Sequence, residues 1–277
     1  MSRINTNTAA YGAYRNLTAT GQKMEKSIEK LSSGFRINRA ADDAAGAAIA
    51  NDLRATGRSL QAAQRNASQA NAVLQIADGA VSTIATILDR MKELATAAAS
   101  DSSGDNGRTN LDAEYQQLVL EIDRIASTTT YQGTALLDGT YTGTFLVSSS
   151  GDYAGNDSIT IDGSTLDMSS ATLTGGVGDL TSLGNAQTEL DAIDTAIAAV
   201  GTAIGVIGAG QSRIEYASAN VGATFENVQA AESVIRDTDM AYEMTQFTKF
   251  QILQQAGTAM LAQANQAPQS ILRLLQG

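Results

Sequence analysis

The feature that most constrains this chain is an apolar repeat in its C-terminal half. Apolar residues recur there at alternating spacings of three and four: Leu190, Ile193, Ile197, Val200, Ile204 and Ile207. After a polar step at Gln211, the register resumes with Ile214, Val221, Phe225, Val228 and Ile235. Such a repeat is typical of a helix with a coiled-coil seam. A helix over 187–235 would be about 73 Å long, so the pattern predicts long antiparallel helices rather than a compact globule.

Glycines interrupt this pattern at one place, the segment 201–210. Gly201, Gly205, Gly208 and Gly210 lie within ten residues. Glycine weakens a helix interior, but it also lets a neighbour come close. Two alternatives follow: the segment bends the helix, or it permits tight packing.

The N-terminal half shows three further helical stretches. Residues 24–35 place Met24, Ile28, Leu31 and Phe35 on one face, and Gly34 is a typical helix terminator. A long helix is predicted over about 44–98, with the stripe Ala77, Val81, Ile84, Leu88, Met91 and Ala95. The segment 100–107 reads as a loop, and Thr109 with Asp112 fits a capping box that begins the next helix. That helix carries the stripe Leu111, Tyr115, Leu118, Ile122 and Ile125.

The middle of the chain, about 128–184, is rich in Thr, Ser, Gly and Asp. Phe145 and Val147, then Ile159 and Ile161, alternate with polar residues, which predicts a β-hairpin followed by a loop. The predicted fold is therefore mainly α: long antiparallel helices in a coiled-coil-like bundle with a small β-hairpin region.

The composition removes several kinds of chemistry. The chain has no His and no Cys, which excludes Ser-His-Asp and Cys-His catalysis, Cys/His zinc sites and disulfides. The net charge of −11 is spread unevenly: residues 41–235 hold eight Lys/Arg and 24 Asp/Glu, while residues 1–40 hold seven and two. An acidic body argues against nucleic-acid binding. The contrast indicates that the ends face a different environment.

The sequence also predicts how the chain relates to membranes. The start, "MSRINTNTAAYG", has no apolar core of the kind that secretory signals carry, so no cleaved signal peptide is expected. No run of 18 uncharged apolar residues occurs, so no transmembrane helix is expected either. The lack of Cys permits an extracellular protein without fixing the compartment.

Three carboxylates, Asp237, Asp239 and Glu243, gather in "RDTDMAYEMTQFTKFQILQQAG". On a continuous helix, Asp237 and Asp239 would lie about 160° apart and could not share a metal. Asp239 and Glu243 would share one face, four positions apart. Arg236 lies three residues before Asp239, and Glu232 lies four before Arg236, so a ladder of surface ion pairs that includes Glu243 is favoured instead. A metal or catalytic site is the weaker alternative.

The residues that follow these acids form a broad apolar face: Met240, Met244, Phe247, Phe250, Leu253, Met260 and Leu261. The other side of this helix carries Gln, Thr and Ala, where a solvated helix would carry charges. Leaving seven such side chains bare would forfeit on the order of 10 kcal/mol or more. The expected partner is further copies of the same chain.

These terminal residues resemble one known family. The stretches "SIEKLSSGFRINRAADDAAGAAIANDLRA" (27–55) and "AESVIRDTDMAYEMTQFTKFQILQQAGTAMLAQANQAPQSILRLLQG" (231–277), with the opening "RINTNTAAYGAYRNL", are similar to bacterial flagellin, the subunit of the flagellar filament. They cover more than a third of the chain, with weaker similarity through 56–138 and 186–230. The resemblance implies a structural protein that needs no enzyme activity and no cofactor.

The resemblance also implies a division of the chain. Segments 1–40 and 236–277 would be inner polymerisation helices, 41–138 and 186–235 the two parts of a helical outer domain, and 139–185 a hairpin and loop region. Little room is left for a variable outer domain, which implies a short flagellin. The residues expected in the inner tube are Ile4, Leu17, Met24, Ile28, Leu31, Phe35, Met240, Met244, Phe247, Phe250, Leu253, Met260, Leu261, Ile271, Leu274 and Leu275.

Further partners are implied by the resemblance alone. They are the flagellar type III export apparatus, hook-associated and cap proteins, and an export chaperone at the C-terminal segment; neither nucleic acid nor membrane is expected. The location implied is the extracellular flagellum. Arg90, Glu93 and Leu94, with Glu114 on the following helix, resemble the surface of flagellin that a host Toll-like receptor reads. The alternative is a charged helix face that packs within the filament.

Three rival functions remain at this point. A hook–filament junction protein of the same superfamily has similar termini. A secreted type III translocator would also be helical, but it would need a membrane-inserting apolar segment. An enzyme would have to use Asp237, Asp239 and Glu243.

Overall fold

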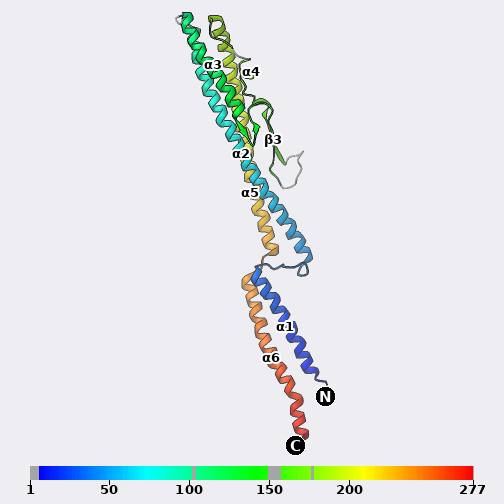
Figure 1. Ribbon diagram of the computed structural model, residues 1–277. Coiled ribbons are helices and arrows are strands. Elements are labelled where there is room, and N and C mark those ends of the chain that lie inside the picture. The colour runs from blue at the N-terminus through cyan, green and yellow to red at the C-terminus, as the bar shows by residue number, and fades with distance from the viewer. Residues whose placement is uncertain (1–5, 102–103, 149–156, 176–177, 277) are drawn as a thin grey trace. The chain divides into compact units, whose positions relative to one another are not determined.

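The structure is a computed structural model that describes residues 6–101, 104–148, 157–175 and 178–276, with side chains as far as residue 266. Its contacts divide the chain into two compact units. Unit 1 contains residues 1–55 and 227–277, and unit 2 contains residues 56–226. Two long helices each contribute to both units (Figure 1).

Long helices dominate the described residues, as the apolar repeats predict. The helices are α1 (Thr8–Ser33), α2 (Ala44–Ala98), α3 (Gly104–Thr128), α4 (Ser170–Leu173), α5 (Leu183–Arg236) and α6 (Met240–Gln276). The strands are β1 (Thr130–Tyr131), β2 (Thr134–Ala135), β3 (Thr142–Leu146) and β4 (Ser158–Asp162), with a 3₁₀ turn, η2 (Gly163–Thr165). The predicted helices over 44–98 and 187–235 are confirmed.

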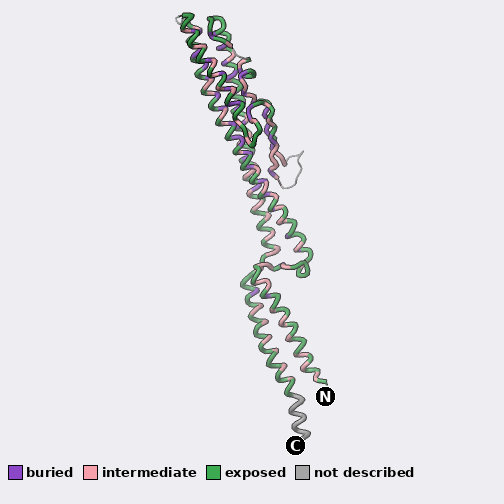
Figure 2. Tube along the Cα trace, in the orientation of Figure 1, coloured by how far each residue is buried: buried purple, intermediate pink, exposed green. Residues whose placement is uncertain are grey.

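The core of unit 2 lies where α2, α3 and α5 run together. Figure 2 shows buried residues concentrated along these helices. All six residues of the predicted α2 stripe are buried: Ala77, Val81, Ile84, Leu88, Met91 and Ala95. On α3, Tyr115, Ile122 and Ile125 are buried, while Leu111 and Leu118 pack at the edge of the core.

The seam of α5 differs from the predicted one by a single position in each turn. Ile193, Val200 and Ile207 are buried as predicted, but the residues between them are Ala196 and Ala203. Ile197 lies at the core edge and Ile204 is exposed. The prediction of Ile197 and Ile204 as seam residues was wrong, because it ranked side chains by apolar size, whereas this seam alternates large residues with alanine.

The glycine-rich segment does not interrupt α5, which is helical throughout 201–210. A Cβ added at Gly201, Gly205 or Gly208 would meet nothing within 4 Å, whereas one at Gly210 would lie 3.2 Å from Leu74 Cδ1. Of the two alternatives, close packing therefore applies to Gly210 alone, and the other three glycines lie on open sides of the helix.

The helix after the first loop begins earlier than predicted. α3 starts at Gly104, so Thr109 is inside the helix and its hydroxyl donates to the Asp105 carbonyl oxygen at 2.9 Å. The predicted capping box at Thr109 and Asp112 was therefore wrong. The missed signal was Arg108, whose buried side chain donates to the carbonyl oxygens of Ala98 at 2.9 Å and Ser100 at 3.1 Å. It satisfies groups at the end of α2 that have no helical partner.

The predicted hairpin is present as β3 and β4, an antiparallel pair in which Phe145 faces Ile159. A second, shorter hairpin pairs β1 with β2, and its two-residue turn is Gln132–Gly133 with φ values of 50° and 82°. Positive φ at both central residues matches the twist of adjoining strands. No strand was predicted here, and residues 41–138 were assigned to the helical outer domain, because two-residue strands leave no alternating pattern.

Length and mean hydropathy alone would let α2 and α5 cross a membrane, with 18-residue windows averaging 1.3 and 1.7. The core helices of a bundle meet the same test. In this structure the apolar side chains of both helices supply the core of unit 2.

Candidate assembly interface

The terminal helices α1 and α6 pack against each other in antiparallel directions within unit 1. At one end, Asn7 Nδ2 donates to the Ala264 carbonyl oxygen at 2.7 Å, and at the other the Thr238 N–H donates to the Gly34 carbonyl oxygen at 2.9 Å. Side chains cap both helices: Asn7 accepts from the Ala10 N–H and Asp239 from the Tyr242 N–H, each at 3.0 Å. At the end of α1, Gly34 has φ 75°, as its predicted role as a terminator requires.

The predicted inner-tube residues fall into two groups in the structure. Partly buried members are Leu17, Met24, Leu31, Phe35, Phe247, Phe250 and Leu261. Exposed members are Ile28, Met240, Met244, Leu253 and Met260, the last with 63% of its surface exposed. Ile4 and the side chains of Ile271, Leu274 and Leu275 lie outside the described residues.

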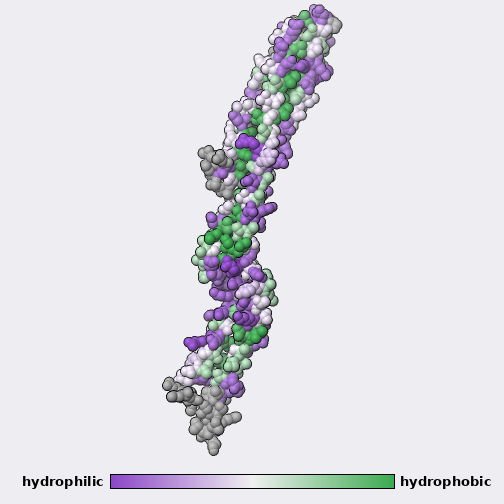
Figure 3. All heavy atoms as spheres, turned by 180° about the vertical axis from the view of Figure 1, so that it is seen from behind, coloured by the Kyte–Doolittle hydropathy of each residue, from purple (hydrophilic) through white to green (hydrophobic). Residues whose placement is uncertain are grey.

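Four further large side chains are exposed on the same two helices. Tyr11 and Tyr14 lie on α1, and Tyr242 and Ile252 lie on α6. Figure 3 shows hydrophobic atoms among hydrophilic ones on the visible surface of the terminal helices. The predicted set did not include these four residues. Tyr14 nevertheless continues the α1 stripe, two heptads before Ile28, and Tyr242 shares a face of α6 with Leu253, eleven positions later.

A junction of two short coil segments joins α1 to α6. Phe35 and Asp237 form an antiparallel bridge, and the Arg36 N–H donates to the Arg236 carbonyl oxygen at 2.6 Å. The guanidinium of Arg236 lies 4.2 Å from the centre of the Phe35 ring, a cation–π contact. Arg236 also pairs with Glu232 at 3.4 Å, and Arg54 approaches the same carboxylate at 3.8 Å.

The three carboxylates that follow Arg236 have separate roles. Asp237 accepts from the Ser233 hydroxyl at 2.6 Å and Asp239 caps α6, because α5 ends at Arg236 and residues 237–239 are not helical. Among the described residues, no three His, Cys, Asp or Glu side chains are placed to hold a metal. The predicted Glu232–Arg236 pair is confirmed, but Glu243 was wrongly placed in a surface ladder.

Glu243 is buried, with 8% of its surface exposed, and so is Ser27 of α1, with 1%. The Ser27 hydroxyl donates to Glu243 Oε1 at 2.5 Å, and Lys30 Nζ lies 3.8 Å from Oε2. Within the described side chains of α1 and α6, these two are the buried ones. The interior of this helix pair therefore centres on a polar contact.

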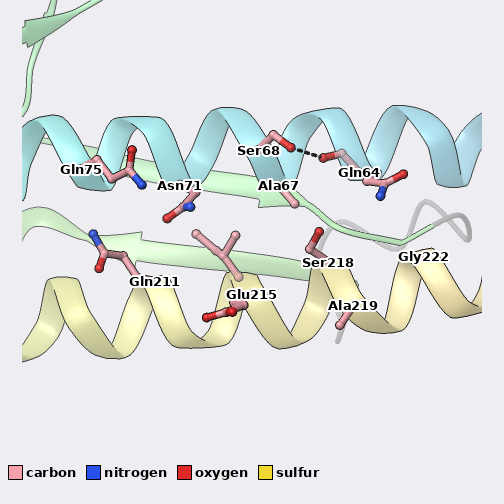
Figure 4. A pocket seen from close by; sticks show the side chains of 11 residues that line it. Gln64, Ala67, Ser68, Asn71, Gln75, Gln211, Glu215, Ser218, Ala219 and Gly222 are labelled. Atoms are coloured by element: carbon pink, nitrogen blue, oxygen red, sulfur yellow. Dashed lines mark hydrogen bonds between the residues drawn. The ribbon is translucent and has the colours of Figure 1, made fainter.

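Unit 2 carries an open groove of about 620 Å³ between α2 and α5. Figure 4 shows side chains from the two helices facing each other across it. Its lining is mostly amide, hydroxyl or small: Gln64, Ala67, Ser68, Asn71, Gln75, Gln211, Ile214, Glu215, Ser218, Ala219 and Gly222. Such a lining can hydrogen-bond to water or a polar chain, but its one charge, on Glu215, offers no acid–base pair.

The charged surface formed by α2 and α3 is held together by Arg90. Its guanidinium donates to Glu114 at 2.8 and 3.0 Å and to Glu93 at 2.8 Å. Arg90, Glu93 and Glu114 are exposed. Leu94 is only 3% exposed and belongs to the core, so it is not part of this surface.

Comparison with known families covers most of the chain. Residues 4–142 match the bacterial flagellin N-terminal helical region, and residues 190–275 match the bacterial flagellin C-terminal helical region. Flagellin from Halalkalibacterium halodurans is 42% identical over 275 residues, which cover 99% of each chain. Because both chains are matched almost end to end, this is a short form of the family.

Other relatives agree. The flagellar filament 33 kDa core protein of Treponema phagedenis is 39% identical over 293 residues, covering 99% of each chain. Flagellin from Bacillus subtilis (strain 168) is 37% identical over 304 residues, covering 99% of this chain and all of the relative. The crystal structure of Bacillus cereus flagellin has a TM-score of 0.50 and 31% identity, covering 57% of this chain and 88% of that one.

Long terminal helices with exposed apolar side chains and end-to-end similarity agree on one assignment: the chain belongs to the bacterial flagellin family, the structural subunits of the extracellular flagellar filament.

Proposed function

We propose that the α1–α6 helix pair is the polymerising part of this subunit. Segments 1–40 and 236–277 form the inner wall of the filament, where neighbouring copies cover their exposed apolar side chains. Segments 41–138 and 186–235, with the 139–185 region, form the outer helical part. The compact unit that holds α1 and α6 reaches further along α2 and α5, to residues 55 and 227.

The observation that carries this proposal is the exposure of apolar side chains on a helix almost without charge. Met244, Ile252, Leu253 and Met260 are exposed on α6, and Lys249 is the one charged residue between positions 244 and 272. A helix surface of this kind is typical of one that another protein surface covers. Repetition of one head-to-tail contact that does not close produces a helical polymer.

The test is seeded polymerisation of the full chain, read by pelleting and by electron microscopy of the pellet. Leu253→Glu places a charge on the exposed face of α6, and we expect it to abolish filament formation. Leu120→Glu is the matched control, because Leu120 is 61% exposed on α3 in unit 2. We expect that variant to polymerise. Normal filaments from Leu253→Glu would contradict the proposal.

The proposed function also includes export of the subunit and its contacts with other flagellar proteins. We infer from family membership that the chain leaves the cell through the flagellar type III apparatus, with a chaperone on its C-terminal segment, and joins hook-associated and cap proteins. The exposed apolar residues of α6 give such a chaperone a surface to cover before assembly. A pull-down of cytosolic subunits, compared with a chain truncated before residue 240, tests the chaperone.

A receptor contact is a second proposal, favoured by the exposed ion-paired cluster of Arg90, Glu93 and Glu114. We propose that a host Toll-like receptor reads this cluster on the monomer. A receptor reporter assay with the unmodified monomer and Arg90→Ala decides the matter, with circular dichroism to check folding. Lack of signal from the unmodified monomer would remove the proposal. Leu94→Ala is unsuitable as a probe because Leu94 is buried.

A further inference from the structure

The methionines of this chain fall into two groups by their exposure. Met91 and Met168 are buried in the core of unit 2, and each has at most 1% of its surface exposed. Met240, Met244 and Met260 lie on α6 and are 47%, 50% and 63% exposed. Among the described side chains, exposed methionine therefore occurs on α6 alone.

The exposed methionines lie on both flanks of the contact between α6 and α1. Glu243 marks the side of α6 that is buried against α1, because the Ser27 hydroxyl donates to its carboxylate. Successive helical residues differ in direction by about 100°, so Met244 lies about 100° to one side of Glu243. Met260, seventeen positions after Glu243, lies about 100° to the other side. Copies that cover the helix pair from either flank would therefore meet one of these thioethers.

Methionine provides the only sulfur in this chain, because there is no Cys. Hydrogen peroxide oxidises a thioether by transferring one oxygen atom to the sulfur, while the other oxygen atom leaves as water. The sulfur gives up two electrons and the peroxide accepts them, so the products are a sulfoxide and water. The reaction needs no other group of the protein, and its rate depends on access to the sulfur. The exposed methionines of α6 should therefore react first.

A sulfoxide would change the surface of α6 from apolar to polar at these positions. The new oxygen is hydrated in the free chain, so covering it with an apolar surface costs free energy unless a donor replaces the water. The threonine hydroxyls of α6 are already engaged: Thr245, Thr248 and Thr258 donate to carbonyl oxygens of their own helix at 2.6, 2.9 and 2.8 Å. Lys249 is the one charged residue between positions 244 and 272. Apart from glutamine amides, this surface therefore has few donors to offer a sulfoxide.

We propose that Met240, Met244 and Met260 are oxidation sites of the free subunit, and that sulfoxides at these positions keep the subunit out of the filament until they are reduced. In the assembled state, neighbouring copies shield the same thioethers from the oxidant. This inference rests on the proposed polymerising role of α1 and α6, because a surface that no copy covers would tolerate a sulfoxide.

The first experiment maps the reactivity of each methionine in the full chain. Monomer and filament are treated with the same dose of hydrogen peroxide, and peptide mass spectrometry follows each sulfoxide with time. In the monomer we expect the three α6 methionines to oxidise at least about tenfold faster than Met91 and Met168, because access to the sulfur differs. In the filament that ratio should fall at least about fivefold. Equal rates for all methionines in the monomer, or equal rates for the α6 methionines in both states, would overturn the proposal.

The second experiment determines whether oxidation blocks assembly through these side chains. Peroxide-treated monomer is seeded and pelleted, and each chain is compared with its own untreated sample. The pelleted fraction of the parent should fall at least about fivefold, whereas that of M240L/M244L/M260L should fall less than about twofold. M91L/M168L is the matched control, because Leu replaces Met with little change of volume at buried positions, and it should lose as much as the parent. Equal loss in all three chains would overturn the proposal.

Repair of the sulfoxides supplies a further test that needs no substitution. Methionine sulfoxide reductases act on one sulfoxide epimer each, so a mixture of both types with a thiol reductant restores the thioether. Oxidised parent monomer should recover at least about half of its pelleted fraction after this treatment, and the reductant without the enzymes should not restore it. Sulfoxides that disappear from the mass spectra without recovery of assembly would overturn the proposal, because another lesion would then be responsible.

The variant Leu253→Glu separates failure of this inference from failure of the proposed function. If Leu253→Glu and the oxidised parent both polymerise normally, the α6 surface has no part in assembly and both proposals fail. If Leu253→Glu stays in solution while the oxidised parent polymerises, the α6 surface drives assembly but tolerates sulfoxides, and this inference alone is overturned. The expected result is loss of assembly in both chains, with the reductases restoring only the oxidised parent.

Discussion

Inside unit 2, the hydroxyl of Tyr115 on α3 donates a hydrogen bond to the carboxylate of Glu189 on α5. Both residues are buried. A Cβ at Gly178 would fall 1.7 Å from Glu189 Oε2, so the backbone closes over this contact. The pair joins two core helices through polar groups in an otherwise apolar interior.

Removing the hydroxyl should therefore destabilise unit 2. Tyr115→Phe leaves the Glu189 carboxylate buried without its donor, which costs about 1–3 kcal/mol. Chemical denaturation followed by far-ultraviolet circular dichroism measures the change in unfolding free energy. Tyr216→Phe is the matched control, because Tyr216 is 78% exposed, and it should leave stability unaltered. Equal stability of both variants would contradict the prediction.

The same contact should make stability depend on pH. Burial raises the pKa of Glu189 above its ordinary value of 4.5, and the Tyr115 hydrogen bond opposes this only in part. At pH values between the ordinary pKa of Glu189 and its raised pKa in the folded chain, the folded chain keeps a proton that the unfolded chain has lost. The unfolding free energy therefore falls as pH rises through this window. In Glu189→Gln that loss is absent.

The measurement compares the unfolding free energies of Glu189→Gln and the parent from pH 4 to 8. The difference between the two unfolding free energies should be constant below pH 4.5, the ordinary pKa of the glutamate. Above that pH the variant should become more stable relative to the parent. Glu121→Gln is the control, because the hydrogen bond from Arg124 lowers the pKa of Glu121 below its ordinary value of 4.5, so the difference for this variant should be flat above that pH. A flat difference for Glu189→Gln would refute the prediction.

Arg108 should determine how firmly the α2–α3 turn closes. Arg108→Leu removes the donors to the Ala98 and Ser100 carbonyl oxygens, a loss of about 1–3 kcal/mol. Hydrogen exchange should rise in peptides around the turn and remain unchanged in α5. Arg124→Leu, on the exposed side of α3, serves for comparison and should have little effect. Equal protection of the turn in both variants would count against this role.

Replacing a glycine on the open side of α5 by alanine should stabilise the protein. Gly205→Ala adds a methyl group where nothing lies within 4 Å, so it should raise stability by about 0.5–1 kcal/mol through helix propensity. Gly178→Ala should destabilise, because its Cβ would overlap Glu189. Thermal unfolding of the two variants should give shifts of opposite sign, and a lower midpoint for Gly205→Ala would be the adverse result.

Protease sensitivity should differ between the free subunit and the filament. The terminal helices have few buried side chains of their own, so in the monomer we expect both ends to be trimmed to a core near residues 45–235. Filaments should resist. Limited digestion with mass spectrometry of the fragments reads both states. Equal resistance of monomer and filament would disprove the dependence on neighbours.

The sequence predicted the long helices well because their signal is repeated many times. The α2 stripe from Ala77 to Ala95 is buried throughout. The errors arose where a large apolar side chain does not occupy a buried position of the helix. Ile204 is large and exposed, while Ala203 is small and buried, since a helix seam rewards fit to the neighbour rather than hydrophobicity.

Polar contacts were the part that the sequence could not predict. Ser27 and Glu243 are 216 positions apart, and Tyr115 and Glu189 are 74 apart. Nothing local marks either pair, because a periodic pattern records which face is buried but not which polar groups meet there. Arg108 had a nearer signal, a basic residue soon after a helix end, but the loop expected over 100–107 concealed it.

The β3–β4 hairpin of unit 2 is a suitable place to insert a foreign segment. The Val147 N–H donates to the Asp157 carbonyl oxygen at 2.9 Å, so these two residues lie side by side at the end of the strand pair. A foreign segment whose own ends lie equally close could be grafted between these residues while β3, β4 and the helices keep their places. On a polymer of identical subunits, one such graft would be displayed once per copy, as a regular array on a thread of protein.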